Sequence, residues 1–418
     1  MRFPKKGRQE CGRELERMQS EALWSTPLDD VATALVKLPA GTDLRVEAAG
    51  AAATVRLTED IPLGHKFSVH ALAEGLRVRK YGEFIGRMTH GVDAGSWVHV
   101  HNLETCARRG PANERLWLEE GEAPRIVEVI GERRATVGES PVWDAGTGRL
   151  YWVDVRGEPA IFMHDTWTGA NAEWSMPEDI GSIVLDTSGR LVAAMRSGFA
   201  MFDPRSGTVK PLFDPEPDLP GNRLNDAKCD PAGRLWSGSM NPESGLAEGS
   251  LYMVGPDLSC RRVADGFVTP NGHVWSLHGS TMYLSDTRRG YIYAYAFDPV
   301  TGEAGERRVF ADLGALPGGP DGATVDAEGY LWSAQFNGGC LLRLSPSGEI
   351  DRVVHLPVSK PSSCAFGGPD HGLLYVTTAT RGLGPGGLAA ERHAGRVLVL
   401  DVGVRGLAPA RFDLCEDR

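Results

Sequence analysis

The sequence predicts an all-β protein in which a six-bladed β-propeller follows a small β-rich module. Three observations favour this fold class. A turn-and-strand pattern recurs six times after about residue 125, its copies are 41–48 residues apart, and the first 110 residues lack it. The 52 glycines and 27 prolines suit a fold with many turns. A chain of 418 residues is too long for one ordinary core, so two domains are expected.

Each repeat begins with a small polar turn that contains Gly, followed by an aromatic or aliphatic strand. The copies are DAGTGRLYWVD, DTSGRLVAAM, DPAGRLWSGS, LHGSTMYLSD, DAEGYLWSAQ and PDHGLLYVTT, and a second strand follows each of them. A period of about 40–50 residues is typical of propeller blades. One blade cannot bury its faces alone, so ring closure should make the repeats one domain, at residues 126–415.

The first 110 residues contain short alternating stretches such as LRVEAAG and ATVRLTE, separated by Gly and Pro. This pattern indicates a small β-rich module, which we place at residues 27–107 behind a charged extension over residues 1–26. The polar, Pro-containing segment ARRGPANERLWLEEGEAP follows the module, and residues 108–125 are therefore the predicted linker.

The charge distribution excludes some partners. Residues 1–110 carry 16 basic and 14 acidic side chains, whereas the remainder carries 28 and 41. Such an acidic domain repels nucleic acid and anionic membranes and favours cations. We therefore expect neither nucleic acid nor a membrane as a partner. The sequence contains no run of about 18 apolar residues, so no membrane span is expected. The opening residues do not resemble a signal peptide, and the seven cysteines lack a CxxC pair, so we expect a cytoplasmic protein with reduced thiols.

A polar residue precedes most of the repeats by about ten to twelve positions. Innermost propeller strands line the central channel, so equivalent positions in different blades should converge near the axis. Oxygen donors without imidazole or thiolate suit a hard cation such as Ca²⁺, Mg²⁺ or Mn²⁺. Asn or Asp before Gly also forms ordinary turns, but four in the same phase favour a shared site. The four residues are Glu139, Asn225, Asn271 and Asp321, while Gly181 and the Ser363–Cys364 pair leave room in the other two blades.

Arg223 lies two residues before Asn225. Side chains alternate along a strand, so both should face the channel while Asp226 points away. An arginine beside a cation is suited to hold an oxygen-rich or anionic substrate. A salt bridge between blades is the alternative role for Arg223.

The motifs GESPVW, RLNDAKCDP, NGHVW, PDGATVDAEGYLW and SSCAFGG resemble, in order and in phase, the gluconolactonase, senescence-marker-protein (regucalcin) and luciferin-regenerating family. The resemblance spans about residues 130–405 and implies a metal-dependent sugar lactonase on a six-bladed propeller. It implies metal ligands at Glu139, Asn271 and Asp321 and substrate contacts at Arg223, Asn225 and Glu243.

The amino-terminal module holds five of the eleven histidines, between positions 65 and 101. A transition-metal site and an ordinary polar strand face are both open, but no carboxylate or thiolate spacing supports a metal. The stretches DDVATALVKLPAGTDL, IPLGHK, RKYGEFIGR and GSWVHVHN resemble the SAF-type (β-clip) domain of altronate and galactarate dehydratases. The catalytic domain of those dehydratases is absent, so the resemblance suggests a dehydratase large subunit as a partner.

The two resemblances together imply hydrolysis of a sugar lactone, such as arabinono-, galactaro- or gluconolactone, to its sugar acid in oxidative sugar catabolism. One divalent cation (Ca, Mn, Mg or Zn) would polarise the lactone carbonyl and activate water. Asp321 is the candidate catalytic proton acceptor, although coordination to a cation weakens a carboxylate as a base. The alternative is a non-catalytic subunit of an altronate/galactarate-type dehydratase complex that binds a metal or a sugar acid.

Overall fold

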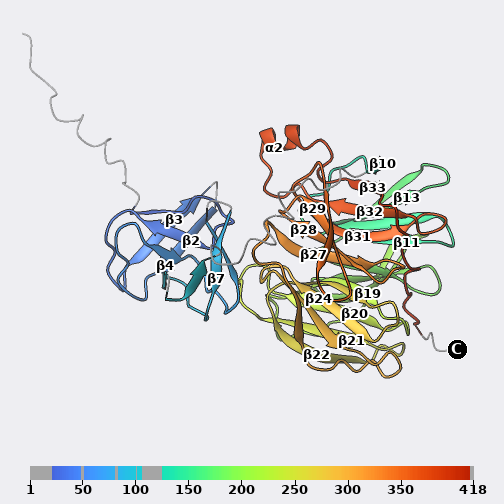
Figure 1. Ribbon diagram of the computed structural model, residues 1–418, viewed down its shortest axis with the longest axis horizontal. Coiled ribbons are helices and arrows are strands. Elements are labelled where there is room, and N and C mark those ends of the chain that lie inside the picture. The colour runs from blue at the N-terminus through green and yellow to red at the C-terminus, as the bar shows by residue number, and fades with distance from the viewer. Residues whose placement is uncertain (1–20, 49–50, 81–82, 100, 106–124, 415–418) are drawn as a thin grey trace, which may run out of the picture. The chain divides into compact units, whose positions relative to one another are not determined.

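The computed structural model consists of two compact units built almost entirely from β-strands (Figure 1). The helix that the described residues contain, α2 (Pro385–Ala390), is short, and the predicted all-β class is confirmed. No described helix has the length and apolar character that a membrane span requires. The residues that the structure describes are 21–48, 51–80, 83–99, 101–105 and 125–414.

The first unit contains three sheets and its own apolar core. The sheets consist of β1 (Ala22–Leu23), β2 (Val31–Ala34), β5 (Lys66–Ser68) and β8 (Trp97–Val98); of β3 (Asp43–Ala48) and β4 (Ala51–Arg56); and of β6 (Arg77–Lys80), β7 (Glu83–Met88) and β9 (Leu103–Thr105). Strand β3 alternates between exposed and buried side chains, so Leu44, Val46 and Ala48 face the core. Phe67 of β5 is fully buried there. The alternating sequence therefore did indicate strands in this unit.

This unit begins earlier than the sequence suggests. We expect a charged extension up to residue 26, but β1 pairs with β2 and places Ala22 opposite Ala34. Ala22 and Trp24 are buried in the core. A two-residue strand is too short to show hydrophobic periodicity, so the pattern missed it. Apart from Arg125, the predicted linker at residues 108–125 lies outside the described residues.

The second unit contains six four-stranded antiparallel sheets. The first three consist of β11 (Gly138–Asp144), β12 (Arg149–Asp154), β13 (Ala160–Asp165) and β14 (Asn171–Ser175); β15 (Ile180–Leu185), β16 (Leu191–Met195), β17 (Gly198–Asp203) and β18 (Thr208–Phe213); and β19 (Arg223–Cys229), β20 (Leu235–Met240), β21 (Gly249–Val254) and β22 (Cys260–Phe267). The last three consist of β23 (Pro270–Trp275), β24 (Thr281–Asp286), β25 (Tyr291–Ala296) and β26 (Arg308–Asp312); β27 (Gly319–Val325), β28 (Leu331–Phe336), β29 (Cys340–Leu344) and β30 (Ile350–His355); and β31 (Pro361–Gly367), β32 (Leu373–Thr378), β33 (Val397–Asp401) and β10 (Arg125–Ile130).

The first strands of the six sheets contact one another in a closed cycle, as in a propeller. The contacts run from β11 through β15, β19, β23, β27 and β31 and back to β11. The residues at the equivalent position of the six sequence repeats all lie in second strands; these are Leu150, Leu191, Leu235, Tyr283, Leu331 and Leu374. The sixth sheet takes its outer strand from the start of the unit, because β10 pairs with β33. Repeat counting could not predict this closure, since β10 carries none of the repeat motif.

The repeated turns join the first and second strands, and their aspartates have a structural role. Asp230 accepts hydrogen bonds from the backbone N–H of Arg234 at 3.1 Å and from the indole of Trp236 at 3.0 Å. Asp326 likewise accepts one from the indole of Trp332 at 2.9 Å. Because these buried carboxylates have partners within their own turns, they hold the hairpins together and are not candidate ligands.

The pairing between first and second strands shifts register near the start of every first strand. In β11 the shift falls between Glu139 and Val142, and in β23 between Asn271 and Val274. A bulge of this kind redirects side chains and breaks the simple alternation of a strand. The remaining shifts fall at Ile180/Ser182, Leu224/Ala227, Pro320/Ala323 and Pro361/Ser363.

Small side chains at these shifts bring the first strands together. The hydroxyl of Ser140 donates to the carbonyl of Ile183 at 3.1 Å, and that of Ser182 donates to the carbonyl of Asn225 at 2.7 Å. Gly181 approaches the next strand so closely that a Cβ there would lie 2.5 Å from the Asn225 carbonyl oxygen. Gly181 therefore permits close packing of two neighbouring strands. The sequence suggested only that this residue leaves free space in its blade.

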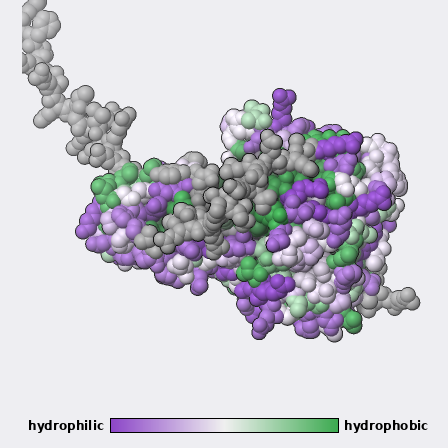
Figure 2. Space-filling view, viewed as in Figure 1, coloured by the Kyte–Doolittle hydropathy of each residue, from purple (hydrophilic) through white to green (hydrophobic). Residues whose placement is uncertain are grey.

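The apolar core of the second unit lies between neighbouring sheets. Trp236 and Trp332, one from the third sheet and one from the fifth, are fully buried in such interfaces. On the face shown in Figure 2, hydrophobic residues form small separate patches among hydrophilic ones. The core thus holds the sheets in place, while polar side chains occupy the starts of the first strands.

Candidate functional site

A chain of hydrogen bonds joins polar side chains from three neighbouring sheets. Arg223 Nη1 donates to Asn225 Oδ1 at 2.8 Å, and Asn225 Nδ2 donates to Asn271 Oδ1 at 2.6 Å. Asn271 Nδ2 donates to Thr287 Oγ1 at 2.8 Å. Thr287 is in turn hydrogen-bonded to the carboxylate of Asp321. Four of the residues singled out in the sequence therefore lie in one network.

The carboxylates of Glu139 and Asp321 interact electrostatically. Burial, followed by the negative charges of Asp321 and Asp226, raises the pKa of Glu139 well above its ordinary value. Burial and the charge of Asp226 also raise the pKa of Asp321. Like charges this close cost free energy unless a proton or a cation compensates them.

The two carboxylates differ from structural acids at the same end of the ring. Asp154 accepts hydrogen bonds from the backbone N–H of Thr136 and Val137, both at 3.0 Å. Asp286 likewise accepts two backbone N–H groups at 3.0 Å. By contrast, Asp321 is only 5% exposed, and its Oδ1 has no hydrogen-bond partner among the described residues. An unpaired buried oxygen of this kind points to a ligand.

Asp226 does not point away from the site, contrary to the alternation argument. It is buried, and its Oδ2 accepts a hydrogen bond from the Gly272 N–H at 2.8 Å, next to Asn271. Its charge raises the pKa of Glu139 and of Asp321. The register shift between Leu224 and Ala227 interrupts the alternation at this position, which explains the error.

Two further groups accompany Asp226 inside the ring. His273 is fully buried, with Nδ1 3.6 Å from Asp226 Oδ2. Lys228 donates to the carbonyl of Ala323 in β27. Burial lowers the pKa of Lys228, while the charge of Asp226 opposes that change. These groups support the strands beneath the Glu139–Asp321 pair.

Arg223 is buried, with 8% of its surface exposed. Burial, followed by the positive charge of Arg156, lowers its pKa to about 10. Its Nη1 donates to Asn225 and to the carbonyl of Leu224, both neutral acceptors. No salt bridge of Arg223 occurs within the described residues, so the alternative role as a bridge between sheets finds no support.

Glu243 lies apart from the buried network. It is exposed in the turn after β20, where its Oε1 is 3.4 Å from Arg156 Nη2. A role in contacting substrate would therefore place Glu243 at the rim of the site.

The reasoning from the sequence did not identify Thr287 or Arg156 as residues near the site. Thr287 follows β24, and Arg156 follows β12, so both lie in turns after second strands. Antiparallel pairing brings those turns next to the starts of the first strands, and counting register could have revealed them.

The donor set fits a hard divalent cation. Glu139 and Asp321 supply two carboxylates, and Asn271 supplies an amide oxygen, which together suit Ca²⁺, Mg²⁺ or Mn²⁺. The unpaired Oδ1 of Asp321 and the raised pKa values of both carboxylates agree with this fit. Among the described residues, no group of three or more His, Cys, Asp or Glu side chains is arranged to hold a metal.

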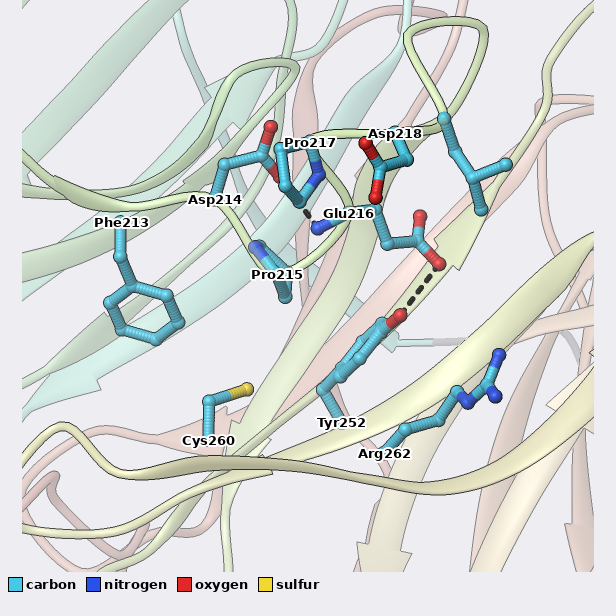
Figure 3. A pocket seen from close by; sticks show the side chains of 10 residues that line it. Phe213, Asp214, Pro215, Glu216, Pro217, Asp218, Tyr252, Cys260 and Arg262 are labelled. Carbon is cyan, nitrogen blue, oxygen red and sulfur yellow. Dashed lines mark hydrogen bonds between the residues drawn. The ribbon is translucent and has the colours of Figure 1, made fainter.

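A separate cavity of about 430 Å³ lies beside the segment between β18 and β19 (Figure 3). Glu216 is one of its charged lining residues, and this carboxylate accepts hydrogen bonds from Tyr252 at 2.8 Å, Ser239 at 2.8 Å and Asn222 at 2.9 Å. No predicted site residue lines the cavity. Because Glu216 is fully engaged, it stabilises the segment before β19 that positions Arg223.

The histidines of the first unit do not form one cluster. His65 and His99 have ring centroids 5.0 Å apart, and Trp97 packs against both rings. His70 is 3.0 Å from Asp30 instead. Burial and then the charge of His65 lower the pKa of His99. The arrangement is an imidazole and indole surface, without the carboxylate or thiolate that most zinc sites include.

Known proteins are similar to this chain over about two thirds of its length. Regucalcin from Xenopus laevis is 36% identical over 293 residues, which cover 68% of this chain and 98% of that protein. YvrE from Bacillus subtilis, named as a candidate sugar lactone lactonase, is 32% identical over 67% of this chain and 96% of its own length. The crystal structure of a calcium-binding protein, regucalcin, from Agrobacterium tumefaciens is 27% identical, with a TM-score of 0.66 over 70% of this chain and 98% of that one.

Two family models cover most of the chain. Residues 20–106 match the altronate/galactarate dehydratase SAF domain, and residues 137–380 match the SMP-30/gluconolactonase/LRE-like region. The second match includes every predicted site residue and more than half of the sequence. The chain therefore belongs to the SMP-30/gluconolactonase/LRE-like family.

Proposed function

We propose that this protein is a sugar lactonase of the cytoplasm, in which a six-bladed propeller follows an amino-terminal β-clip domain. The observation that carries the proposal is the pair of carboxylates formed by Glu139 and the buried Asp321, of which Asp321 is joined to Arg223 through a continuous hydrogen-bond chain. Such a site combines a place for a cation with donors for an oxygen-rich substrate. We place the β-clip domain at residues 27–107 and the propeller at residues 126–415.

Each residue has a distinct role in the proposed hydrolysis. A divalent cation held by Glu139, Asn271 and Asp321 would supply Lewis-acid polarisation of the lactone carbonyl and acidify water. The carboxylate of Asp321 would also accept the proton from the attacking water, although coordination to a cation weakens it as a base. Arg223 and Asn225 orient the sugar oxygens, and Glu243 contacts substrate at the rim.

The family supports this reading at a coarser level. Its name includes gluconolactonases, and YvrE carries a lactonase name. The Agrobacterium tumefaciens regucalcin is described as a calcium-binding protein, which agrees with a divalent cation at the carboxylate pair. The substrate is proposed from the aldono- and aldarolactones, among them arabinono-, galactaro- and gluconolactone.

A panel of purified lactones tests the proposal. We expect ring opening of at least one aldono- or aldarolactone, measured as proton release in weakly buffered solution. An aromatic ester such as p-nitrophenyl acetate is the control, because it lacks the sugar hydroxyls that Arg223 and Asn225 would orient. A protein that opens none of these lactones, with Ca²⁺, Mg²⁺, Mn²⁺ or Zn²⁺ supplied, would contradict the proposed function.

The first unit gives a second prediction. A chain that starts at about residue 120 retains all six sheets and every proposed ligand, so it should fold and hydrolyse lactone like the full chain. Circular dichroism and steady-state kinetics of both forms check this. A shortened protein that folds and binds a cation but has lost turnover would place part of the active site on the first unit.

The SAF match also favours a dehydratase large subunit as a partner of the first unit. The full chain alone should not dehydrate altronate, galactarate or arabinonate. If it did, the histidine surface around Trp97 would be a catalytic centre. A chain that binds a dehydratase but hydrolyses no lactone would instead support the non-catalytic subunit.

A further inference from the structure

Turns at one end of the ring carry arginines from four different sheets. The start of each first strand pairs with the end of the second, so that Gly138 lies opposite Asp154 and Pro270 opposite Asp286. The turn after each second strand is therefore at the same end as the Glu139–Asp321 pair. Such turns contain Arg156, Arg196, Arg288 and Arg381.

Among the described residues, Arg156, Arg196 and Arg381 have fewer carboxylate partners than positive charges. Arg156 Nε and Arg196 Nη2 share one oxygen, Asp179 Oδ2, at 3.2 and 2.8 Å. Arg156 also reaches the exposed Glu243. Arg381 lies exposed at the rim, and among the described residues its guanidinium has no hydrogen-bond partner. Desolvation and then the charge of Arg156 lower the pKa of Arg381, so the two groups are electrostatic neighbours.

Arg223 extends this positive region into the buried site. Its Nη1 contacts only neutral oxygens, and its buried Nε has no partner among the described residues. The charges of Arg156, Arg196 and Arg381 all act on it, and the negative charge of Asp179 opposes them. Asp179 already pairs with both Arg156 and Arg196, so it does not compensate Arg223 alone. A buried guanidinium in this position is stabilised by an anion that arrives from solution.

We propose that the lactone substrate carries a carboxylate of its own, as the monolactone of an aldaric acid does, and that Arg223 and the rim arginines Arg156 and Arg381 bind this carboxylate. The inference rests on the proposed lactonase function. Guanidinium groups bind carboxylates through two parallel hydrogen bonds, whereas a neutral aldonolactone offers only hydroxyls. The positive rim in an otherwise acidic domain also attracts an anionic substrate.

The reaction balances without a further reactant. The oxygen of water joins the lactone carbonyl carbon, the bond from that carbon to the ring oxygen breaks, and the ring oxygen leaves as a hydroxyl with one proton. The new carboxyl group ionises and releases the other proton, so the product is a dicarboxylate.

Matched lactone pairs test the inference. Galactaro-1,4-lactone and galactono-1,4-lactone differ only in a terminal carboxylate against a hydroxymethyl group, and glucaro- and gluconolactones provide a second pair. We expect kcat/KM for the charged member of at least one pair to exceed that for the neutral member by about 10-fold or more. Added salt should reduce this preference, because it screens exposed charges.

Variants locate the origin of the preference. Arg381→Ala and Arg156→Gln should each lower the ratio of charged to neutral kcat/KM by about 10-fold, through loss of a charge-assisted hydrogen bond. Arg205→Ala is the control, since Arg205 follows β17 at the opposite end of the ring and pairs with Asp203. Melting temperatures verify that every variant is folded.

The possible outcomes separate this inference from the function on which it rests. Neutral lactones hydrolysed as fast as charged ones would overturn the inference and leave the lactonase function intact. A charged preference that survives both folded rim variants would also overturn it. Failure to hydrolyse any lactone would instead remove the proposed function.

Discussion

Replacing Asp321 with alanine should lower lactonase kcat/KM by at least about 100-fold, because even indirect supports of a metal site cost about 10- to 100-fold when removed. The change deletes a carboxylate that is buried beside Glu139 and has one oxygen without a partner among the described residues. Steady-state kinetics with saturating cation measures the loss. Arg223→Ala should cost less, since it removes substrate orientation and leaves the cation ligands in place.

Two further variants define the cause of the Asp321 effect. Asp321→Asn keeps the size of the side chain but removes its charge, so it should also lose most activity if the charge is what matters. Asp218→Ala deletes an exposed aspartate beside the outer cavity and should leave kcat/KM unchanged. Near-normal turnover by Asp321→Ala would show that the cation site lies elsewhere.

The fold could be predicted largely because its repeats are physically explicit. Each turn between the first two strands contains small or polar residues with glycine, and each second strand is apolar, so the period was visible in one sequence. The sixth sheet shows the limit of this reasoning. Strand β10 pairs with β33, almost 270 residues later, and no local pattern encodes such a contact.

The candidate site could be predicted only in part. Glu139, Asn271 and Asp321 share a phase within the repeat, so counting predicts that they converge. Asp226 did not follow, because a register shift redirects it and strict alternation no longer applies. The rim arginines lie in turns whose nearness to the site depends on strand pairing, which composition and spacing do not reveal.

Removal of divalent cations should abolish turnover, and added Ca²⁺, Mn²⁺, Mg²⁺ or Zn²⁺ should restore it to different degrees. Zn²⁺ is the least suited to an all-oxygen ligand set. Cation binding should also raise the melting temperature, because a ligand that binds only the folded state at about 100 times its Kd contributes about 2.7 kcal/mol. Asp321→Ala should lose this thermal shift. Full activity in protein shown by elemental analysis to be free of metal would contradict the cation site.

The cation affinity should also depend on pH in a direction that the site determines. The pKa values of Glu139 and Asp321 are raised in the folded, metal-free protein, so protons compete with the cation above the ordinary carboxylate range. A raised carboxylate pKa contributes stability while the group is protonated, and this contribution is lost as pH rises through the folded-state pKa. At high pH, Glu139 and Asp321 therefore contribute least to the stability of the folded, metal-free protein. Cation binding relieves their repulsion most under these conditions. The cation-induced rise in melting temperature should be larger at about pH 8 than at about pH 5, as measured by differential scanning calorimetry. An equal shift at both pH values would mean that the two carboxylates are already ionised at about pH 5, and that they do not repel each other as the structure indicates.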